Sequence, residues 1–291
     1  MPELPEVETI VRALARHLPG RVVERASVPR ANVVRGPVRA FVRAVEGSTI
    51  ESVGRRAKWI LFRLDGGRVW TTHLRMTGKY LFESAGAGRA GRRPARAAVL
   101  DTADAAWVRA EFTFADGGRL LFVDPRTLGE MRVLTDRAWR EVEAALGPEP
   151  LEPGFTADAL RARLAGRRRA VKELLLDQTV VAGLGNIYAS EALWRARISP
   201  RRRGAGVGPE RARRLRDAVV EVLTDALGGG GTTFPGATWM NYAGAEGAAG
   251  AFYDFLAVYD REDEPCRRCS APIRRIVQGQ RSTYYCPTCQ R

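Results

Sequence analysis

Residues 266–289 read CRRCSAPIRRIVQGQRSTYYCPTC. This stretch holds all four cysteines of the chain, in two pairs with two residues inside each pair and sixteen residues between the pairs. The spacing is typical of a zinc ribbon, in which two thiolate knuckles close a tetrahedral site. A closed site leaves no coordination position for water, so we expect one structural Zn²⁺ and no catalytic metal or organic cofactor. The expected ligands are Cys266, Cys269, Cys286 and Cys289.

The same stretch is strongly basic, as is the whole chain. The residues from Cys266 to Arg291, both included, comprise six arginines and no acidic residue. The full chain has 291 residues, 47 Lys and Arg against 33 Asp and Glu, and a formal net charge of +14. A basic ribbon in a basic chain indicates nucleic-acid binding. A hydrophobic content of 45% excludes disordered and collagen-like classes, and the length predicts about two domains.

The chain has no segment that resembles a membrane span or a secretory signal. No run approaches the roughly 18 apolar residues that a span requires. Glu3, Glu6 and Glu8 stand where a signal peptide would be cationic. We therefore expect a monomeric cytoplasmic protein with no membrane partner.

The first part of the chain has the pattern of a helix followed by strands. Apolar residues recur at three- and four-residue steps over 4–18, which predicts a leading helix. Beyond Gly20, short stretches rich in β-branched and aromatic residues alternate with turns, notably Asp-Gly-Gly at 65–67 and 116–118. We predict an antiparallel β-sandwich domain over 1–134. Within it, the small and basic segment 84–97 is expected to be a loop.

Helical patterns follow a Pro- and Gly-rich stretch at 147–154. We place a linker region at 135–154, a helical domain at 155–260 and the zinc ribbon at 261–291. The expected helices span 135–146, 156–165, 170–177, 186–196 and 209–228. Two glycine-bearing turns in DQTVVAGLGN (177–186) lead into a helix with Asn186 predicted at its N-cap, which gives a helix-two-turn-helix motif. The fold class is therefore α+β.

The N-terminus carries the chemistry. Removal of the initiator methionine would expose Pro2 as a secondary amine. An α-amino group has a pKa of about 8, so a larger fraction of it is neutral at pH 7 than of a lysine side chain. Such an amine can attack a sugar carbon and form an iminium. Glu3 lies beside it and can pass a proton to the sugar ring oxygen. Glu6, one turn further, either supports this chemistry or only complements the helix dipole.

Five motifs resemble the bacterial formamidopyrimidine-DNA glycosylase and endonuclease VIII family, and the opening motif is nearer the formamidopyrimidine branch. They extend from the first residue almost to the last. The motifs are MPELPEVET at 1–9, HLRMTG at 73–78, DPRTLG at 124–129, LLDQTVVAGLGNIYASEAL at 175–193 and QRSTYYCPTCQ at 280–290. The resemblance implies a bifunctional base-excision repair enzyme that acts on damaged double-stranded DNA.

The resemblance also implies residue roles. Pro2 is the Schiff-base nucleophile and Glu3 the proton donor. Lys58 holds a phosphate beside the lesion and takes part in elimination, although a lysine at a strand end is more often a solvated edge charge. Asn186 and Arg281 are phosphate ligands, and Arg281 also serves elimination.

A second group of residues is implied to bind the DNA around the extruded base. Met76, Arg126 and Leu128 fill the void that the base leaves. The alternative for Met76 is plain core packing. His73 has a supporting role, and Lys172 is placed with the DNA-binding residues.

Two regions depart from the family pattern and leave base preference open. Residues 228–251 form a long glycine-rich segment, in which 233–237 replace the usual start of the base-capping loop. The strand before DPR reads DAAWVRAEF (104–112) instead of a basic, histidine-containing run. We expect 8-oxoguanine and formamidopyrimidines as substrates, with an oxidised-pyrimidine or broad specificity as the alternative. A non-catalytic DNA-binding protein is a remote alternative, since Pro2 and Glu3 are both present.

Overall fold

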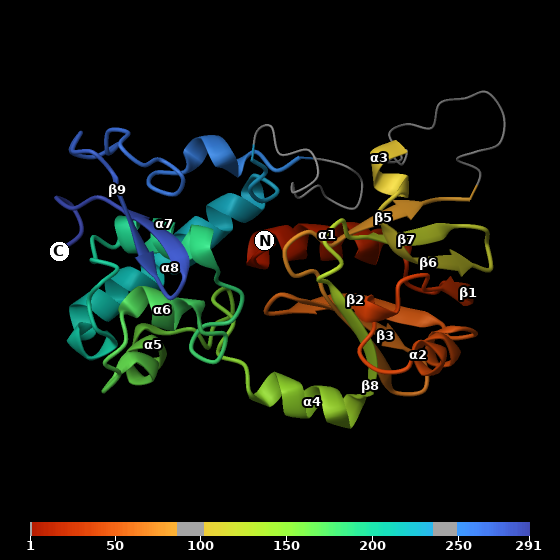
Figure 1. Cartoon of the computed structure of the whole chain (residues 1–291). Coiled ribbons are helices and arrows are strands. Elements are labelled where there is room, and N and C mark those ends of the chain that lie inside the picture. The colour runs from red at the N-terminus through yellow and green to blue at the C-terminus, as the bar shows by residue number, and fades with distance from the viewer. Residues whose placement is uncertain (1, 86–101, 235–248) are drawn as a thin grey trace. The chain divides into compact units, whose positions relative to one another are not determined.

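The computed structural model describes residues 2–85, 102–234 and 249–291 (Figure 1). The chain divides into two compact units. The first comprises Met1–Glu143 with Gly229–Ala251, and the second comprises Ala144–Gly228 with Phe252–Arg291. The glycine-rich residues 229–251 thus belong to the first unit, whereas the sequence boundaries placed them within the helical domain.

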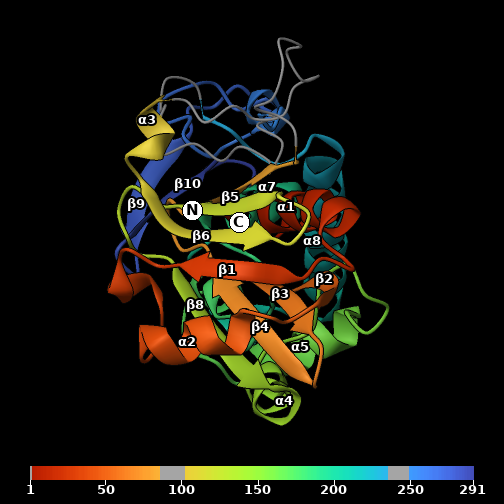
Figure 2. The ribbon, with the colours of Figure 1, turned by 90° about the vertical axis from the view of Figure 1, so that its right-hand side faces the viewer.

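The first unit contains two four-stranded antiparallel sheets, which Figure 2 shows as two layers. One sheet has the order β1-β6-β7-β5, with bounds Val23–Ser27, Val108–Phe114, Arg119–Val123 and Lys79–Glu83. The other has the order β2-β3-β4-β8, with bounds Ile50–Arg56, Trp59–Leu64, Arg68–His73 and Glu130–Thr135. The predicted sandwich and the α+β class are confirmed.

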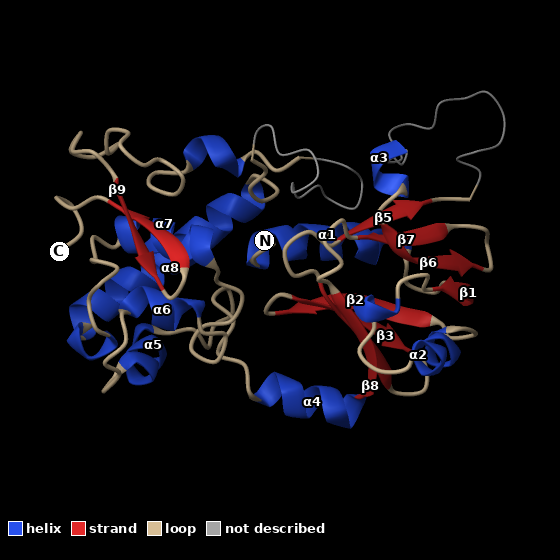
Figure 3. Ribbon diagram, viewed as in Figure 1, coloured by secondary structure: helices blue, strands red, loops and turns tan. Residues whose placement is uncertain are grey.

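An aromatic core joins the two sheets. Trp70 of β4 stacks on Phe62 of β3 at 4.2 Å between ring centroids, and it lies 4.3 Å from Phe112 of the other sheet. Helix α1 (Leu4–His17) adds Ile10 and Leu14 to the same core. Because one stripe of α1 is buried in this core, the start of the chain is fixed on the sandwich (Figure 3).

Some elements of the first unit were not expected from the sequence. These are α2 (Val38–Val45), the short α3 (Thr102–Ala105), the 3₁₀ helix Ala31–Val33 and strand β8. Helix α2 has only eight residues and no side-chain hydrogen bond at its N-cap Pro37, so the usual start signal of a helix is missing. Helix α4 (Asp136–Ala144) follows β8 directly, inside the predicted 135–146 range.

The second unit has four of the expected helices and a β-hairpin. The helices are α5 (Ala157–Leu164), α6 (Val171–Leu176), α7 (Asn186–Arg195) and α8 (Pro209–Gly228), with 3₁₀ turns at Gly204–Gly206 and Phe252–Phe255. Strands β9 (Arg274–Gln278) and β10 (Arg281–Tyr285) pair antiparallel around Gly279 and Gln280, both with positive φ. Left-handed backbone at both turn residues matches the twist of a tight hairpin. Within the described ranges, no helix combines the length and the apolar character that crossing a membrane requires.

Candidate functional site

The N-terminal turn of α1 is held by two buried carboxylates in a capping box, in which the Glu3 side chain also accepts from the Glu6 N–H. Glu3 is the N-cap residue, and both Glu3 and Glu6 are 2% exposed. The Glu6 carboxylate accepts hydrogen bonds from the Glu3 N–H and the Thr232 N–H, each at 2.8 Å. Gly231 has φ +90°, and a Cβ there would lie 2.9 Å from Glu6 Oε1. Glu6 therefore connects the backbone beside Pro2 to the glycine-rich segment. This role goes beyond complementing the dipole of helix α1.

Lys58 lies in the turn between β2 and β3, next to Ala57 with φ +53°. Its side chain is buried, with only 5% exposed. Arg55 donates one hydrogen bond to the Glu8 carboxylate of α1 at 2.8 Å and another to the Ala57 carbonyl at 2.9 Å. The turn that carries Lys58 is thus fastened to the same helix that carries the N-terminus. This burial differs from the solvated edge charge that a strand-end lysine usually is.

His73 ends β4 in a partly buried, cationic environment. Its Nδ1 accepts a hydrogen bond from the Arg75 N–H at 3.0 Å, and the Trp59 ring meets it edge-on at 5.0 Å. Burial, together with the charges of Arg75 and Lys58, lowers the pKa of His73 to about 3, while Glu130 opposes the shift. The imidazole is therefore neutral at pH 7 and acts as a hydrogen-bond acceptor.

Met76, Arg126 and Leu128 are exposed on two turns of the first unit. Met76 is 41% exposed and Leu128 is 44% exposed, whereas most large apolar side chains of this unit are buried. The Arg126 guanidinium lies 3.5 Å from the Met76 sulfur. Core packing does not explain this Met76. Exposed apolar side chains on turns that also carry an arginine have the composition of a DNA wedge.

A buried aspartate supports both turns. Asp124 is fully buried and accepts hydrogen bonds from the Thr77 hydroxyl and from the backbone N–H groups of Arg126 at 3.3 Å and Gly129 at 2.7 Å. A Cβ on Gly129 would lie 2.4 Å from Phe122 Cζ. Sequence reasoning did not single out these supporting residues, although the glycine that ends each motif was a signal for close packing.

The second unit joins Asn186 to the zinc-ribbon hairpin. Asn186 is the first residue of α7, and Gly185 is its N-cap, so the predicted N-cap was wrong by one residue. The Asn186 side chain instead donates to the Ser282 carbonyl at 2.9 Å and accepts from Lys172 Nζ at 2.5 Å. Lys172 is 0% exposed, which corrects the expectation that it contacts DNA directly. Arg281, next to Ser282, is exposed at the start of β10.

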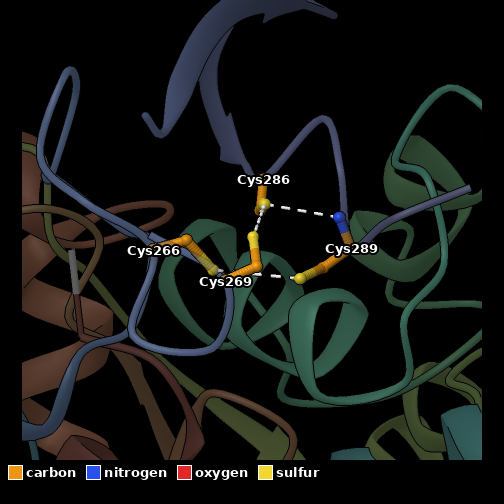
Figure 4. Close-up of side chains that lie close together, drawn as sticks. All are labelled: Cys266, Cys269, Cys286 and Cys289. Carbon is orange, nitrogen blue, oxygen red and sulfur yellow. Dashed lines mark hydrogen bonds between the residues drawn. The ribbon is translucent and has the colours of Figure 1, made fainter. Parts of the chain in front are cut away.

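The four cysteines converge in the second unit (Figure 4). Their sulfur atoms all lie within 4.8 Å of one another, with 4.0 Å between Cys266 and Cys289 and 3.5 Å between Cys269 and Cys286. Tetrahedral Zn–S bonds of about 2.3 Å place the sulfurs roughly 3.8 Å apart. The Trp194 indole N–H donates to the Cys266 sulfur at 3.4 Å. The donor set and its spacing fit a four-thiolate zinc site.

Comparisons with known proteins agree with this geometry. Family models match the formamidopyrimidine-DNA glycosylase N-terminal domain at residues 1–131, its H2TH domain at 146–235, and the zinc finger found in FPG and IleRS at 263–291. The formamidopyrimidine-DNA glycosylase of Chloroflexus aurantiacus is 42% identical over 291 residues, covering 100% of this chain and 98% of the relative. The chain belongs to the formamidopyrimidine-DNA glycosylase family.

Solved structures of the family match over the whole chain. A Lactococcus lactis Fpg mutant in complex with Fapy-dG DNA gives a TM-score of 0.85 at 30% identity, covering 100% of both chains. The wild-type L. lactis Fpg in complex with oxidised-pyrimidine DNA gives a TM-score of 0.84 at 30% identity, with the same coverage. The resemblance drawn from the sequence motifs is confirmed, and the enzyme class is that of a DNA glycosylase.

Three sequence expectations fall on residues that the structure does not describe. They concern the removal of Met1, most of the basic loop at 84–97, and residues 235–248 of the glycine-rich segment. The described stem of that segment, Gly229–Phe234, is the part that Glu6 holds through Thr232.

Proposed function

We propose that this DNA glycosylase removes oxidised bases from duplex DNA with Pro2 as the nucleophile and Glu3 as the proton donor. Membership of the formamidopyrimidine-DNA glycosylase family supports the reaction class. The observation that supports the residue assignment is the fixed conformation of the N-terminal turn. There a buried carboxylate fixes the backbone of Glu3 on a helix that is packed into the core.

The proposed chemistry begins when the Pro2 amine, freed by loss of Met1, attacks the anomeric carbon of the damaged nucleotide. The glycosidic bond breaks and the base leaves. Glu3 protonates the ring oxygen, so the sugar opens and an iminium forms on Pro2. The iminium makes the adjacent C–H acidic, and successive β- and δ-elimination then expel the two phosphates.

The DNA is held by cationic and amide groups on both units. We assign phosphate contacts to Lys58 in the first unit and to Asn186 and Arg281 in the second. Lys58 lies in a tight turn, Asn186 at the start of α7 and Arg281 at the start of β10. Each element fixes the backbone of the residue that would donate to a phosphate, which supports this assignment. Met76, Arg126 and Leu128 fill the space that the extruded base leaves, and their exposure supports that role.

The four cysteines hold one structural Zn²⁺. Sulfur spacings of 3.5–4.0 Å support this assignment. When bound, the metal would supply no reaction step, because four thiolates fill its coordination sphere. It would stabilise the knuckles that carry the β9–β10 hairpin, and Arg281 with it.

We propose oxidised purines as the principal substrates, with oxidised pyrimidines as the second candidate. The enzyme from L. lactis has been captured with DNA of both kinds. Leu128 is aliphatic and stacks on bases less well than an aromatic side chain. We therefore expect its insertion to depend less on stacking with the neighbouring base pair.

A panel of duplexes tests this proposal. Each carries 8-oxoguanine, a formamidopyrimidine, thymine glycol or dihydrouracil, and base release is measured in single-turnover reactions against every opposite base. We expect the fastest release from the purine lesions and loss of release in Glu3→Gln. Binding to lesion DNA with no release from any duplex would favour the non-catalytic alternative.

A further inference from the structure

Lys172 occupies an unusual position for a lysine. Its side chain is completely buried at the N-terminal end of α6. Nζ donates hydrogen bonds to Asn186 Oδ1 at 2.5 Å, to Thr283 Oγ1 at 2.6 Å and to the Ser282 carbonyl at 3.1 Å. One ammonium thus joins α6, the start of α7 and strand β10, all within the second unit.

The first consequence concerns the orientation of the Asn186 amide. An unrestrained amide can present either its oxygen or its NH₂ group, and only the NH₂ group can donate to a phosphate. Because Nζ lies against Oδ1, the oxygen is directed inward and Nδ2 carries the outward donor. One hydrogen of Nδ2 is used by the Ser282 carbonyl, and the other is the donor that we assign to a phosphate at this partly exposed side chain.

The second consequence concerns the start of β10. The Ser282 carbonyl receives hydrogen bonds from both Lys172 and Asn186, so the backbone immediately after Arg281 is fixed to the helices. The hairpin turn is packed closely on α6 as well, since a Cβ on Gly279 would lie 3.2 Å from Glu173 Oε1. The ammonium therefore supports Asn186 directly and Arg281 through the neighbouring Ser282 carbonyl. These are the two residues of this unit to which we assign phosphate contacts.

We propose that Lys172 is a positioning residue, which acts on DNA only through Asn186 and the β10 backbone. The proposal rests on the phosphate roles given above for Asn186 and Arg281. It replaces direct DNA contact by Lys172 with control of amide orientation. It also makes the helix-two-turn-helix motif and the hairpin bind the backbone as one unit.

A double-mutant cycle tests the proposal, with full-length protein and a duplex containing a tetrahydrofuran abasic-site analogue. Lys172→Met and Asn186→Ala should each weaken equilibrium binding about tenfold, the loss expected for a hydrogen bond to a charged group. The loss in the double variant should be clearly smaller than the two single losses combined, because both changes remove the Asn186 contact. Any loss that Lys172→Met still causes in the Asn186→Ala background measures its action through the β10 backbone. Lys79→Met is the control for charge, since Lys79 is ion-paired with Asp104 at 2.8 Å; its affinity should change less than twofold.

A second variant keeps the proposal testable if Lys172→Met does not fold. Thr283→Val removes one acceptor of the ammonium at a fully buried position and keeps the shape of the side chain. It should weaken binding severalfold, and this effect should be smaller in the Asn186→Ala background. Losses that add across either cycle, or a Lys172→Met protein that folds and binds normally, would overturn the proposal. Because the cycle measures binding and not excision, absence of excision in the wild type would contradict the proposed function alone.

Discussion

Among the individual residues, the lysines are the informative cations of a chain whose basic residues are nearly all arginine. Lys58, Lys79 and Lys172 are its only lysines. Lys58 is 5% exposed, Lys79 is paired with Asp104, and Lys172 is completely buried. A compact ammonium can donate in three directions from a confined space, which a planar guanidinium cannot do. The scarcity of lysine in the sequence therefore marks positions with a geometric demand.

Glu6→Gln should separate the two halves of the reaction. The carboxylate accepts from two backbone N–H groups, and an amide can accept through only one oxygen. We expect base release to fall by at least tenfold, because the glycine-rich stem is no longer held. Strand cleavage at a preformed abasic site should fall less, since that step has no base to hold. Equal losses in both assays would contradict this role, and Glu24→Gln at an exposed site is the control.

His73 predicts a pH dependence of stability. The pKa of about 3 in the folded protein lies below the ordinary 6.5 of the unfolded chain. Between these values the unfolded chain binds a proton that the folded protein does not, so the free energy of unfolding falls as the pH is lowered from 6.5 toward 3. The slope from this group is at most about 1.4 kcal/mol per pH unit. Urea titrations from pH 7 to pH 4 should show a weaker dependence in His73→Asn, whereas the control His17→Asn should keep it.

At the residue scale, the sequence allows a prediction where the chemistry is local. The roles proposed for Pro2 and Glu3 rest on adjacent residues at a helix start, and the structure places Glu3 at the N-cap of α1. Prediction failed at Lys172, because the burial of that side chain depends on Ser282 and Thr283, more than 100 residues away. Residue spacing along a six-residue helix cannot reveal such a partner.

Among the structural elements, two short turns of the first unit are held by the packing of their glycines. The turns at 74–78 and 124–129 each end in a glycine and share the Thr77–Asp124 hydrogen bond. A Cβ on Gly78 would meet the Leu74 carbonyl oxygen at 2.6 Å. Close packing at both glycines holds the turns that present Met76, Arg126 and Leu128.

Gly129→Ala should therefore harm both stability and activity. The added methyl group would lie 2.4 Å from Phe122 in the core, so ring or turn must shift. We expect a loss of about 2 kcal/mol in the free energy of unfolding, the usual cost of overpacking, and slower base release. Gly54→Ala in β2 is the matched control, because a methyl group on Gly54 would have nothing within 4 Å. Equal effects of the two substitutions in urea titrations would contradict the packing argument.

Metal removal tests whether the cysteine knuckles support the β9–β10 hairpin. Four thiolates hold their knuckles through the metal, so a chelator should release one zinc per chain and loosen the hairpin β9–β10. We expect DNA affinity to fall at least tenfold while the first unit keeps its own unfolding transition. Zinc content, binding and thermal unfolding measured together check this. Full affinity in metal-free protein would show that the ribbon does not need the ion.

The elements were predictable where their patterns were long or repeated. The helices of the second unit lie within the ranges that periodicity gave. Helix α2 and strand β8 were missed because each is short and lacks a local start signal. Their positions are fixed by packing, as with Phe41 of α2 against Trp70 at 5.9 Å.

The molecule as a whole has a net charge of +14, which attracts a polyanion without selecting a lesion. Selection and chemistry depend on a few fixed groups. The first unit carries the N-terminus and the exposed Met76, Arg126 and Leu128, to which we assign void filling. The second carries Asn186 and Arg281, to which we assign phosphate contacts, and the cysteine cluster. The family and the division into sandwich, helices and ribbon could be read from motifs. The grouping of residues 229–251 with the first unit could not, because it depends on the contact between Glu6 and Thr232.

We expect the nitrogen of Pro2 to form the covalent intermediate. Borohydride trapping on 8-oxoguanine duplex, followed by peptide mass spectrometry of the adduct, measures this directly. We predict one cross-link, on the peptide that begins with Pro2, and none in a protein that retains Met1. A cross-link on any lysine peptide, or base release with no trapped adduct from protein whose N-terminal proline is verified, would contradict it.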